Sequence, residues 1–386
     1  MQKRANHLIA IKAFTRQSLP IPVPSGTSWE SAVKTLLEKW EDERTGYLSV
    51  RSPISFETLF ERSRQQKGIF PLIAEERAAV KSFAYYPSLG ILQIRDAKGV
   101  ILGYRFKIPP HLLTTLNNSS QTLNSYEAGT SRGGGRDRLR LGPRGLYETR
   151  HYAVWADYSK KYVESQELLE DGEKGREWLR ENQELFDYCS NQLRFLCPEQ
   201  YVRLTGSVVK DMAKTQNADG ARKLRPLGGA WHEACLNQGM DSKSGSRCHQ
   251  DWLDDKRLFN CVAPFGEGFE GGELVLWQMK MRIGLEIGDG FFFYGSLVAH
   301  EVMDITTGVR NSIDLFTHAS NFELLAKHEK AAANKVKHLV KEKLRATRKK
   351  EERRKVEENA GARSKIQQGK KLRQSAACLM KNKSGM

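Results

Sequence analysis

The sequence contains no run of apolar residues long enough to cross a membrane. An apolar stretch near the start, Leu8–Phe14, is short and is interrupted by Lys12. No signal-peptide core or cleavage pattern accompanies this stretch. These absences predict a soluble intracellular protein with no membrane partner.

Cysteines are few and scattered. The six cysteines form no Cys-x-x-Cys pair, which is the spacing typical of structural zinc sites. Their scatter is typical of buried free thiols in a reducing compartment. The sequence also has no internal repeat, so a solenoid or array is not indicated.

Most of the chain lacks a strong excess of either charge. Of the 62 Lys and Arg and 46 Asp and Glu residues, residues 321–386 contain 20 and 7 respectively, a net charge of +13. The remaining residues are close to neutral, at +3. A basic C-terminal segment of this kind indicates a polyanionic partner or a nuclear address, and we expect a nuclear protein.

Short β-rich runs recur between glycine-rich turns over residues 201–320. This spacing is typical of a β-sandwich or barrel. We predict an α+β protein with a double-stranded β-helix (jelly-roll) core backed by helices. The predicted parts are a mixed α+β N-terminal extension (1–118), a Gly/Arg-rich flexible loop (119–146), the jelly-roll core (147–320), and a basic helix followed by a disordered tail (321–386).

Two histidines and one carboxylate stand out in the core segment. His249 and Asp251 are separated by one residue, so their side chains point the same way on an extended segment, and His300 follows in another β-like run. Two imidazoles and one carboxylate bind Fe(II) on one face and leave the opposite face open. A His-x-Asp pair alone is a weak signal that arises by chance, so the prediction depends on the whole set.

A cation and a hydroxyl follow the last of these histidines. Arg310 and Ser312 are again two residues apart on a predicted strand. Together they suit a carboxylate through charge-assisted and hydroxyl hydrogen bonds. The sequence therefore predicts that 2-oxoglutarate is the co-substrate of an Fe(II) oxygenase.

The segment Asn237–Ser320 resembles the 2-oxoglutarate/Fe(II)-dependent dioxygenases of the TET/JBP class, fungal type. Two upstream stretches, Arg225–His232 and Tyr147–Trp155, look like further motifs of that type. The resemblance implies that His249, Asp251 and His300 bind iron. It also implies that Arg310 and Ser312 bind the distal carboxylate of 2-oxoglutarate.

The resemblance further implies three substrate-binding residues. Asp254 would accept a hydrogen bond from the exocyclic amine of a flipped base, Phe316 would stack on the base, and His318 would bind its edge. The alternatives are a surface carboxylate for Asp254 and a core aromatic for Phe316. AlkB-type repair enzymes carry a second arginine at the position of Phe316, so the sequence disfavours that relationship.

These observations predict an enzyme that oxidises 5-methylcytosine in double-stranded DNA to hydroxymethyl-, formyl- and carboxylcytosine by base flipping. Asp254 suits the amine of N6-methyladenine equally well, so demethylation of that base stays open. The alternative class is a 2-oxoglutarate-dependent protein side-chain hydroxylase. The basic stretch Ser131–Arg140 would contact DNA phosphates or form a solvated loop. The oligomeric state is not predicted.

Overall fold

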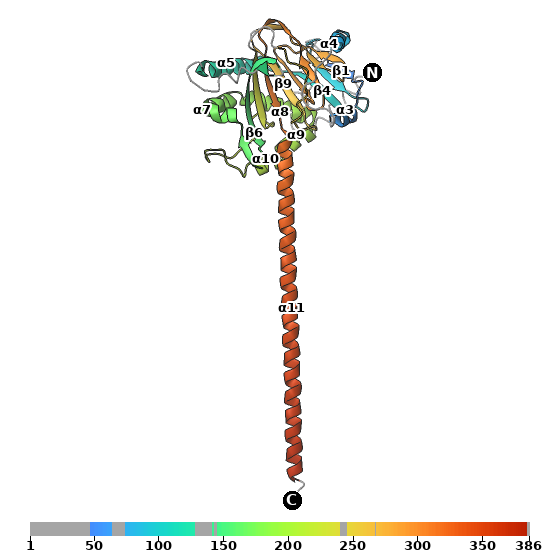
Figure 1. Cartoon of the computed structure of the whole chain (residues 1–386), viewed down its shortest axis with the longest axis vertical. Helices are drawn as coiled ribbons and strands as arrows, with labels where there is room; N and C mark the ends of the chain where they lie inside the picture. The colour runs from blue at the N-terminus through green and yellow to red at the C-terminus, as the bar shows by residue number, and fades with distance from the viewer. Residues whose placement is uncertain are drawn as a thin grey trace, which may run out of the picture. The chain divides into compact units, whose positions relative to one another are not determined.

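The computed structural model describes residues 47–63, 74–127, 141–142, 145–239, 245–266 and 268–383. The chain divides into two units, one ending at Leu325 and one beginning at Ala326 (Figure 1). The first unit holds every described strand and all described helices except most of α11. The predicted basic stretch at 131–140 lies outside the described residues.

A ten-stranded sheet forms the larger layer of the first unit. Neighbouring strands are antiparallel except for the parallel pair β1 and β3. In spatial order its strands are β1 (Tyr47–Arg51), β3 (Ile91–Arg95), β4 (Ile101–Lys107), β13 (Asp289–Phe293), β9 (Asn260–Phe265), β16 (Asn311–Phe316), β8 (Glu233–Gly239), β6 (Gly145–Ala156) and β5 (Leu141–Gly142), with β7 (Tyr162–Glu164) also paired to β6.

A smaller sheet shares an apolar core with the larger one. Phe293 of the large sheet packs edge-on against His300 of the small sheet, with ring centroids 4.8 Å apart. The small sheet runs β14 (His300–Val302), β11 (Leu274–Leu276), β12 (Met281–Ile283) and β2 (Ala84–Tyr86), and a separate ribbon pairs β10 (Phe269–Gly271) with β15 (Ile305–Gly308). This arrangement confirms the predicted α+β class with a jelly-roll core.

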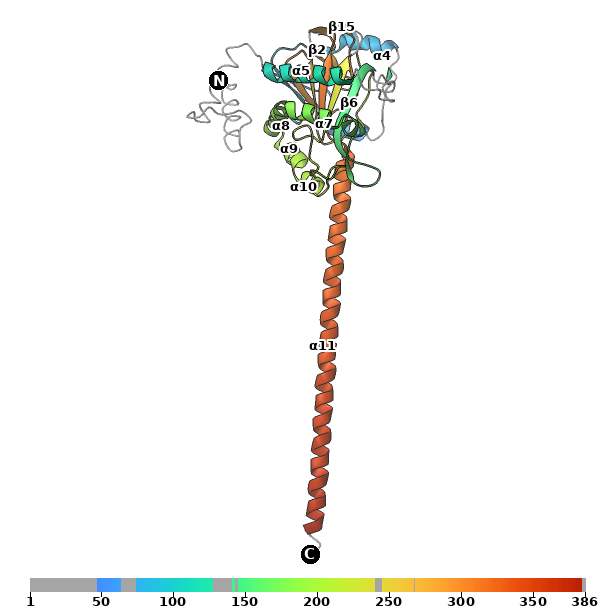
Figure 2. The same ribbon diagram turned by 90° about the vertical axis from the view of Figure 1, so that its left-hand side faces the viewer.

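Helices back the large sheet, as Figures 1 and 2 show for α5, α7 and α8. Tyr152 of β6 packs against Trp178 of α7, with ring centroids 5.5 Å apart. Gly175 lets the helix approach, because a Cβ there would lie 3.2 Å from the Tyr152 ring. The helices of this unit are α3 (Phe56–Arg62), α4 (Ala74–Ala79), a 3-10 turn (Val80–Ser82), α5 (Pro110–Glu127), α7 (Gln166–Glu181), α8 (Gln183–Leu196), α9 (Pro198–Thr205) and α10 (Ser207–Met212).

The predicted boundary at residue 118 does not separate the extension from the core. Strands β3 and β4 are members of the large sheet, because β4 pairs with β13 along its length. Leu92 and Ile94 are fully buried in the same core as the jelly-roll strands. These strands therefore belong to the sandwich itself.

The polar stretch predicted to begin a flexible loop instead completes α5, which continues to Glu127. Ser119 and Ser120 are buried and bonded to the neighbouring helix α7 and the residue that follows it. Ser120 Oγ accepts a hydrogen bond from Trp178 Nε1 at 3.1 Å, and Ser119 Oγ accepts one from Asn182 Nδ2 at 2.9 Å. Polar composition therefore marked an interface between helices, not a loop.

Helix α11 spans Ala319–Lys383, so the tail predicted to be disordered is helical in the structure. Its composition explains this: the helix is rich in Ala, Lys, Glu, Arg and Gln and contains no proline. Residues 326–375 are exposed throughout. Among the described residues, no helix combines the length and apolarity needed to cross a membrane.

Candidate iron and base-binding site

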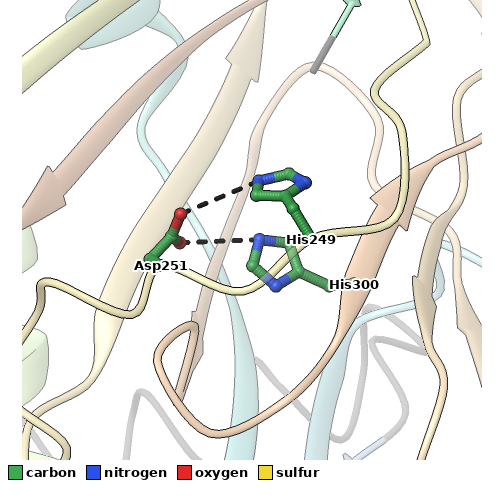
Figure 3. A group of neighbouring side chains, drawn as sticks. All are labelled: His249, Asp251 and His300. Atoms are coloured by element: carbon green, nitrogen blue, oxygen red, sulfur yellow. Dashed lines mark ion pairs between the residues drawn. The ribbon is translucent and has the colours of Figure 1, made fainter. Parts of the chain in front are cut away.

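The side chains of the three predicted ligands point toward one another (Figure 3). His249 Nε2 lies 3.7 Å from Asp251 Oδ1, and His300 Nε2 lies 3.5 Å from Asp251 Oδ2. The ligand atoms all lie within 4.8 Å of one another. His249 and His300 are paired directly, because each backbone N–H donates to the other's carbonyl at 2.9 Å.

The second nitrogen of each imidazole is already engaged. Nδ1 of His249 lies 2.6 Å from the carbonyl oxygen of Arg247, and Nδ1 of His300 lies 2.8 Å from that of Val298. A carbonyl only accepts, so each Nδ1 carries the proton and each Nε2 keeps its lone pair. Two Nε2 lone pairs and one carboxylate, converging from one small region, fit Fe(II).

Asp251, the predicted carboxylate ligand, is held by hydrogen bonds to its backbone and to its side chain. Asp251 donates its backbone N–H to the carbonyl of Gly295 at 3.0 Å, and its Oδ2 accepts from Asn260 Nδ2 at 3.3 Å. Gly295 leaves no room for a side chain, since a Cβ would lie 2.7 Å from Asp251 Oδ2. This glycine lets the Tyr294–Ser296 turn pass directly beside the ligand.

The predicted co-substrate arginine is buried with two of its nitrogens unbonded. Arg310 Nε and Nη2 are covered and make no hydrogen bond within the part of the chain that the structure describes. Burial lowers the pKa of Arg310 to about 10. A buried cation with open donors fits a carboxylate, which would restore the hydrogen bonds and the charge balance. Gly272 keeps this region open, because a Cβ there would lie 3.0 Å from Arg310 Cδ.

Strand pairing determines which side chains are neighbours of Ser312 on the sheet. Ser312 pairs across the sheet with Asn237, whose Nδ2 donates to Ser312 Oγ at 3.4 Å and to Asp314 Oδ2 at 2.6 Å. Asp314 lies between Ser312 and Phe316 on β16, and all three side chains are on the same face of the strand. Burial raises the pKa of Asp314 to about 7, while the nearby Arg310 acts to lower it.

The predicted base-binding residues form a second cluster. Asp254 and His318 are paired across an isolated bridge, and His318 Nε2 lies 3.6 Å from Asp254 Oδ1. Glu233 completes the cluster, with Oε2 at 3.5 Å from the same nitrogen. Burial raises the pKa of Glu233 well above its ordinary value. The Phe316 ring lies 5.9 Å from that of His318, tilted by 42°.

One amide connects the two clusters. Asn260 Nδ2 donates to Asp254 Oδ2 at 2.7 Å and lies 3.3 Å from Asp251 Oδ2. An amide nitrogen carries two hydrogens, so both carboxylates are served at once. The proposed metal ligand and the proposed base reader are thereby held by the same side chain.

Of the eight site residues that the sequence singled out, the structure brings His249, Asp251 and His300 together in one cluster. Asp254 and His318 lie in the second cluster, beside the Phe316 ring. Arg310 and Ser312 lie just before and at the beginning of β16, near Asp314. Sequence reasoning missed Asn260, Asn237, Asp314, Glu233 and Trp155 as members of the site. The signal that finds these residues is strand register. Asp314 follows Ser312 at the i+2 position, and Glu233 is the cross-strand partner of Phe316.

No family model matches the chain, and no curated protein matches it. Similar solved structures include NgTET1 in complex with 5mC DNA, at 15% identity, covering 69% of this chain and 92% of that one with a TM-score of 0.44. A prolyl-4-hydroxylase from Pseudomonas putida is 14% identical and covers 55% and 91%, with a TM-score of 0.29. The viral collagen prolyl hydroxylase of Paramecium Bursaria Chlorella virus-1, bound to 2-oxoglutarate, is 13% identical and covers 55% and 94%, with a TM-score of 0.25. The function proposed below rests on the residues of this chain.

Proposed function

We propose that the protein is an Fe(II)- and 2-oxoglutarate-dependent dioxygenase. The observation that carries this proposal is the triad, in which both imidazoles are locked by their Nδ1 hydrogen bonds with Nε2 facing Asp251. His249, Asp251 and His300 would hold the metal. Arg310 and Ser312 would bind the distal carboxylate of 2-oxoglutarate. When bound, iron and 2-oxoglutarate supply the oxidation of a C–H bond by O₂, with release of succinate and CO₂.

The proposed substrate is 5-methylcytosine in double-stranded DNA, converted to the hydroxymethyl, formyl and carboxyl forms. The support is the second cluster, joined to the first by Asn260. Asp254 would accept from the exocyclic amine, His318 would donate to the ring nitrogen beside it, and Phe316 would stack on the base. A paired base must leave the helix to reach such a pocket.

The proposal also includes a second substrate and a role for helix α11. N6-methyladenine presents the same amine and ring nitrogen, so it is proposed as a second substrate. The exposed, basic helix beyond Ala326 would contribute affinity for DNA phosphates and would direct the protein to the nucleus. The second substrate is proposed from the hydrogen-bonding groups of the base, and the role of the helix from its positive charge.

The proposal is tested by incubating the full chain with Fe(II), 2-oxoglutarate and duplexes that carry 5-methylcytosine, N6-methyladenine or no methyl group. Nucleosides are then analysed by mass spectrometry, and succinate is measured alongside. We expect oxidised cytosines in the first duplex and loss of methyl from the second. His249→Ala should reduce product by roughly a hundredfold or more, since a metal ligand is removed. His111→Ala, at an exposed histidine, is the matched control and should retain activity.

A different result identifies the alternative. Succinate formed with peptide substrates, and none of the methylated bases changed, would replace the DNA proposal with a protein side-chain hydroxylase. Oxidised bases formed equally by His249→Ala would remove the triad from the reaction.

A further inference from the structure

Glu233 is a buried carboxyl to which the proposed reaction assigns no task. It begins β8 with only 1% of its surface exposed. Strand register sets it directly opposite Phe316 on one side and Ala153 on the other. It is therefore the cross-strand neighbour of the residue proposed to stack on the base. A carboxyl buried this deeply needs a specific partner.

Glu233 contacts His318 at two points. Oε1 accepts the backbone N–H of His318 at 3.1 Å, and Oε2 lies 3.5 Å from the ring nitrogen Nε2. Oε2 makes no hydrogen bond among the described residues. A carboxyl in such surroundings carries its charge only beside a cation, and the imidazole is the group that it faces. Glu233 thus favours a doubly protonated ring, in which Nε2–H is directed to the carboxyls and Nδ1–H is the donor that would meet a base.

Two other groups complete the hold on this imidazole. The ring of Trp155 stacks on that of His318, with centroids 5.2 Å apart and planes 6° from parallel. Asp254 Oδ1 lies 3.6 Å from the same Nε2 that Glu233 faces. The stacked indole sets the plane of the ring, and the two carboxyls set the direction of its Nε2–H.

We infer that Glu233 is a positioning residue that holds Nε2 of His318, fixes the ring as a donor through Nδ1–H and thereby sets which bases the pocket accepts. This inference rests on the proposed function. Cytosine and adenine carry an amine beside a ring nitrogen that accepts a hydrogen bond. Thymine carries a carbonyl beside an N–H, which is the reverse pattern. A carboxylate next to a fixed N–H donor accepts the first pattern and rejects the second.

The first test needs no substrate. Histidine ring signals are recorded by NMR in the full chain with ¹⁵N-labelled histidine, for the wild type, Glu233→Gln and Trp155→Ala. We expect both substitutions to move the ring signals of His318 and to leave those of His249 and His300 in place. Glu164→Gln is the control, because Glu164 is also buried but pairs with Arg176. Unmoved His318 signals in both variants would overturn the inference.

The second test is a double-mutant cycle on activity. Glu233→Gln should lower kcat/KM on methylcytosine duplexes roughly ten- to a hundredfold, as expected when a hydrogen bond to a charged group is removed. In a His318→Ala background the same change should have less than about a twofold effect, because Glu233 acts through the ring. Trp155→Ala, at a half-buried position, should behave in the same way and serves if Glu233→Gln does not fold. The preference for methylcytosine over thymine should fall in each single variant.

The outcomes separate the two claims. Independent, multiplying losses in the cycle would show that Glu233 is merely structural and would overturn the inference. A second metal ion per chain that Glu233→Gln alone removes would also overturn it, since the cluster would then be a metal site. Moved His318 signals together with no turnover of any methylated duplex would sink the proposed function and leave the positioning role intact.

Discussion

At the scale of single residues, the raised pKa of Asp314 predicts that binding of 2-oxoglutarate depends on pH. Its pKa is raised from 3.8 to about 7 by burial, so the folded protein holds this carboxyl neutral below pH 7. Above pH 7 it becomes an anion beside Arg310 and Ser312, where the dianionic co-substrate would bind. We expect the KM for 2-oxoglutarate to rise roughly tenfold between about pH 6 and pH 8, the equivalent of about 1.4 kcal/mol. Steady-state kinetics over this range measure it.

Asp314→Asn is the control for that titration, since it keeps the shape of the side chain. Its KM should stay flat over the same range. Stability gives an independent check with a definite sign. A raised carboxyl pKa favours the folded state at low pH, so wild-type stability should fall as pH rises from about 4 to 7, relative to Asp314→Asn. A KM in the wild type that is independent of pH would contradict the assignment.

His249, Asp251, His300 and Arg310 were predictable because few residue types perform their chemistry and their spacing is compatible with strands. Glu233 and Asn260 were not predictable in this way. A buried Glu or Asn in a strand carries no local signal, and its role appears only once β8, β16 and β9 are in register.

At the scale of elements, the turn after β13 leaves room for Asp251, the proposed metal ligand. Gly295→Ala would put a Cβ 2.7 Å from Asp251 Oδ2 and 2.8 Å from Asn260 Nδ2. The carboxylate must then move, so we expect iron affinity to fall by roughly tenfold or more, in the range found when metal-site neighbours are altered. Iron titration followed by calorimetry measures the loss. Gly361→Ala, where a Cβ meets nothing within 4 Å, is the matched control. Equal iron affinity in both variants would contradict this account.

Local composition predicted some boundaries between the parts of the chain incorrectly. The sequence predicted the jelly-roll from its short apolar runs, and the structure has that core. The strands β3 and β4 were assigned to a separate N-terminal extension because the partner that joins them to the core, β13, lies far along the chain. The serines of α5 looked like loop residues because their partners, Trp178 and Asn182, come from a later part of the sequence. In both cases the deciding interaction was distant in sequence.

At the scale of the whole molecule, most of the net positive charge lies in residues 321–386, which include most of helix α11. Changing the five cations between positions 349 and 355 to Gln should weaken DNA binding and reduce its salt dependence. The slope of log Kd against log salt should fall by about 0.9 for each DNA phosphate that the helix no longer neutralises. Turnover at saturating DNA should not change, because these residues are exposed on α11 and take no part in the site. Fluorescence anisotropy at several salt concentrations measures the slope, and an unchanged slope would contradict a role for α11 in DNA binding.

The side-chain amide of Asn260 links the proposed iron site to the proposed base site. Since one amide contacts both Asp251 and Asp254, the proposal predicts that iron bound at Asp251 would alter the free energy of base binding at Asp254. Thermodynamic linkage makes this reciprocal: if a flipped base tightens iron binding by some factor, iron tightens base binding by the same factor. The oxidising centre and the reader of its target would then behave as one cooperative unit, with full affinity for either partner reached only in the presence of the other.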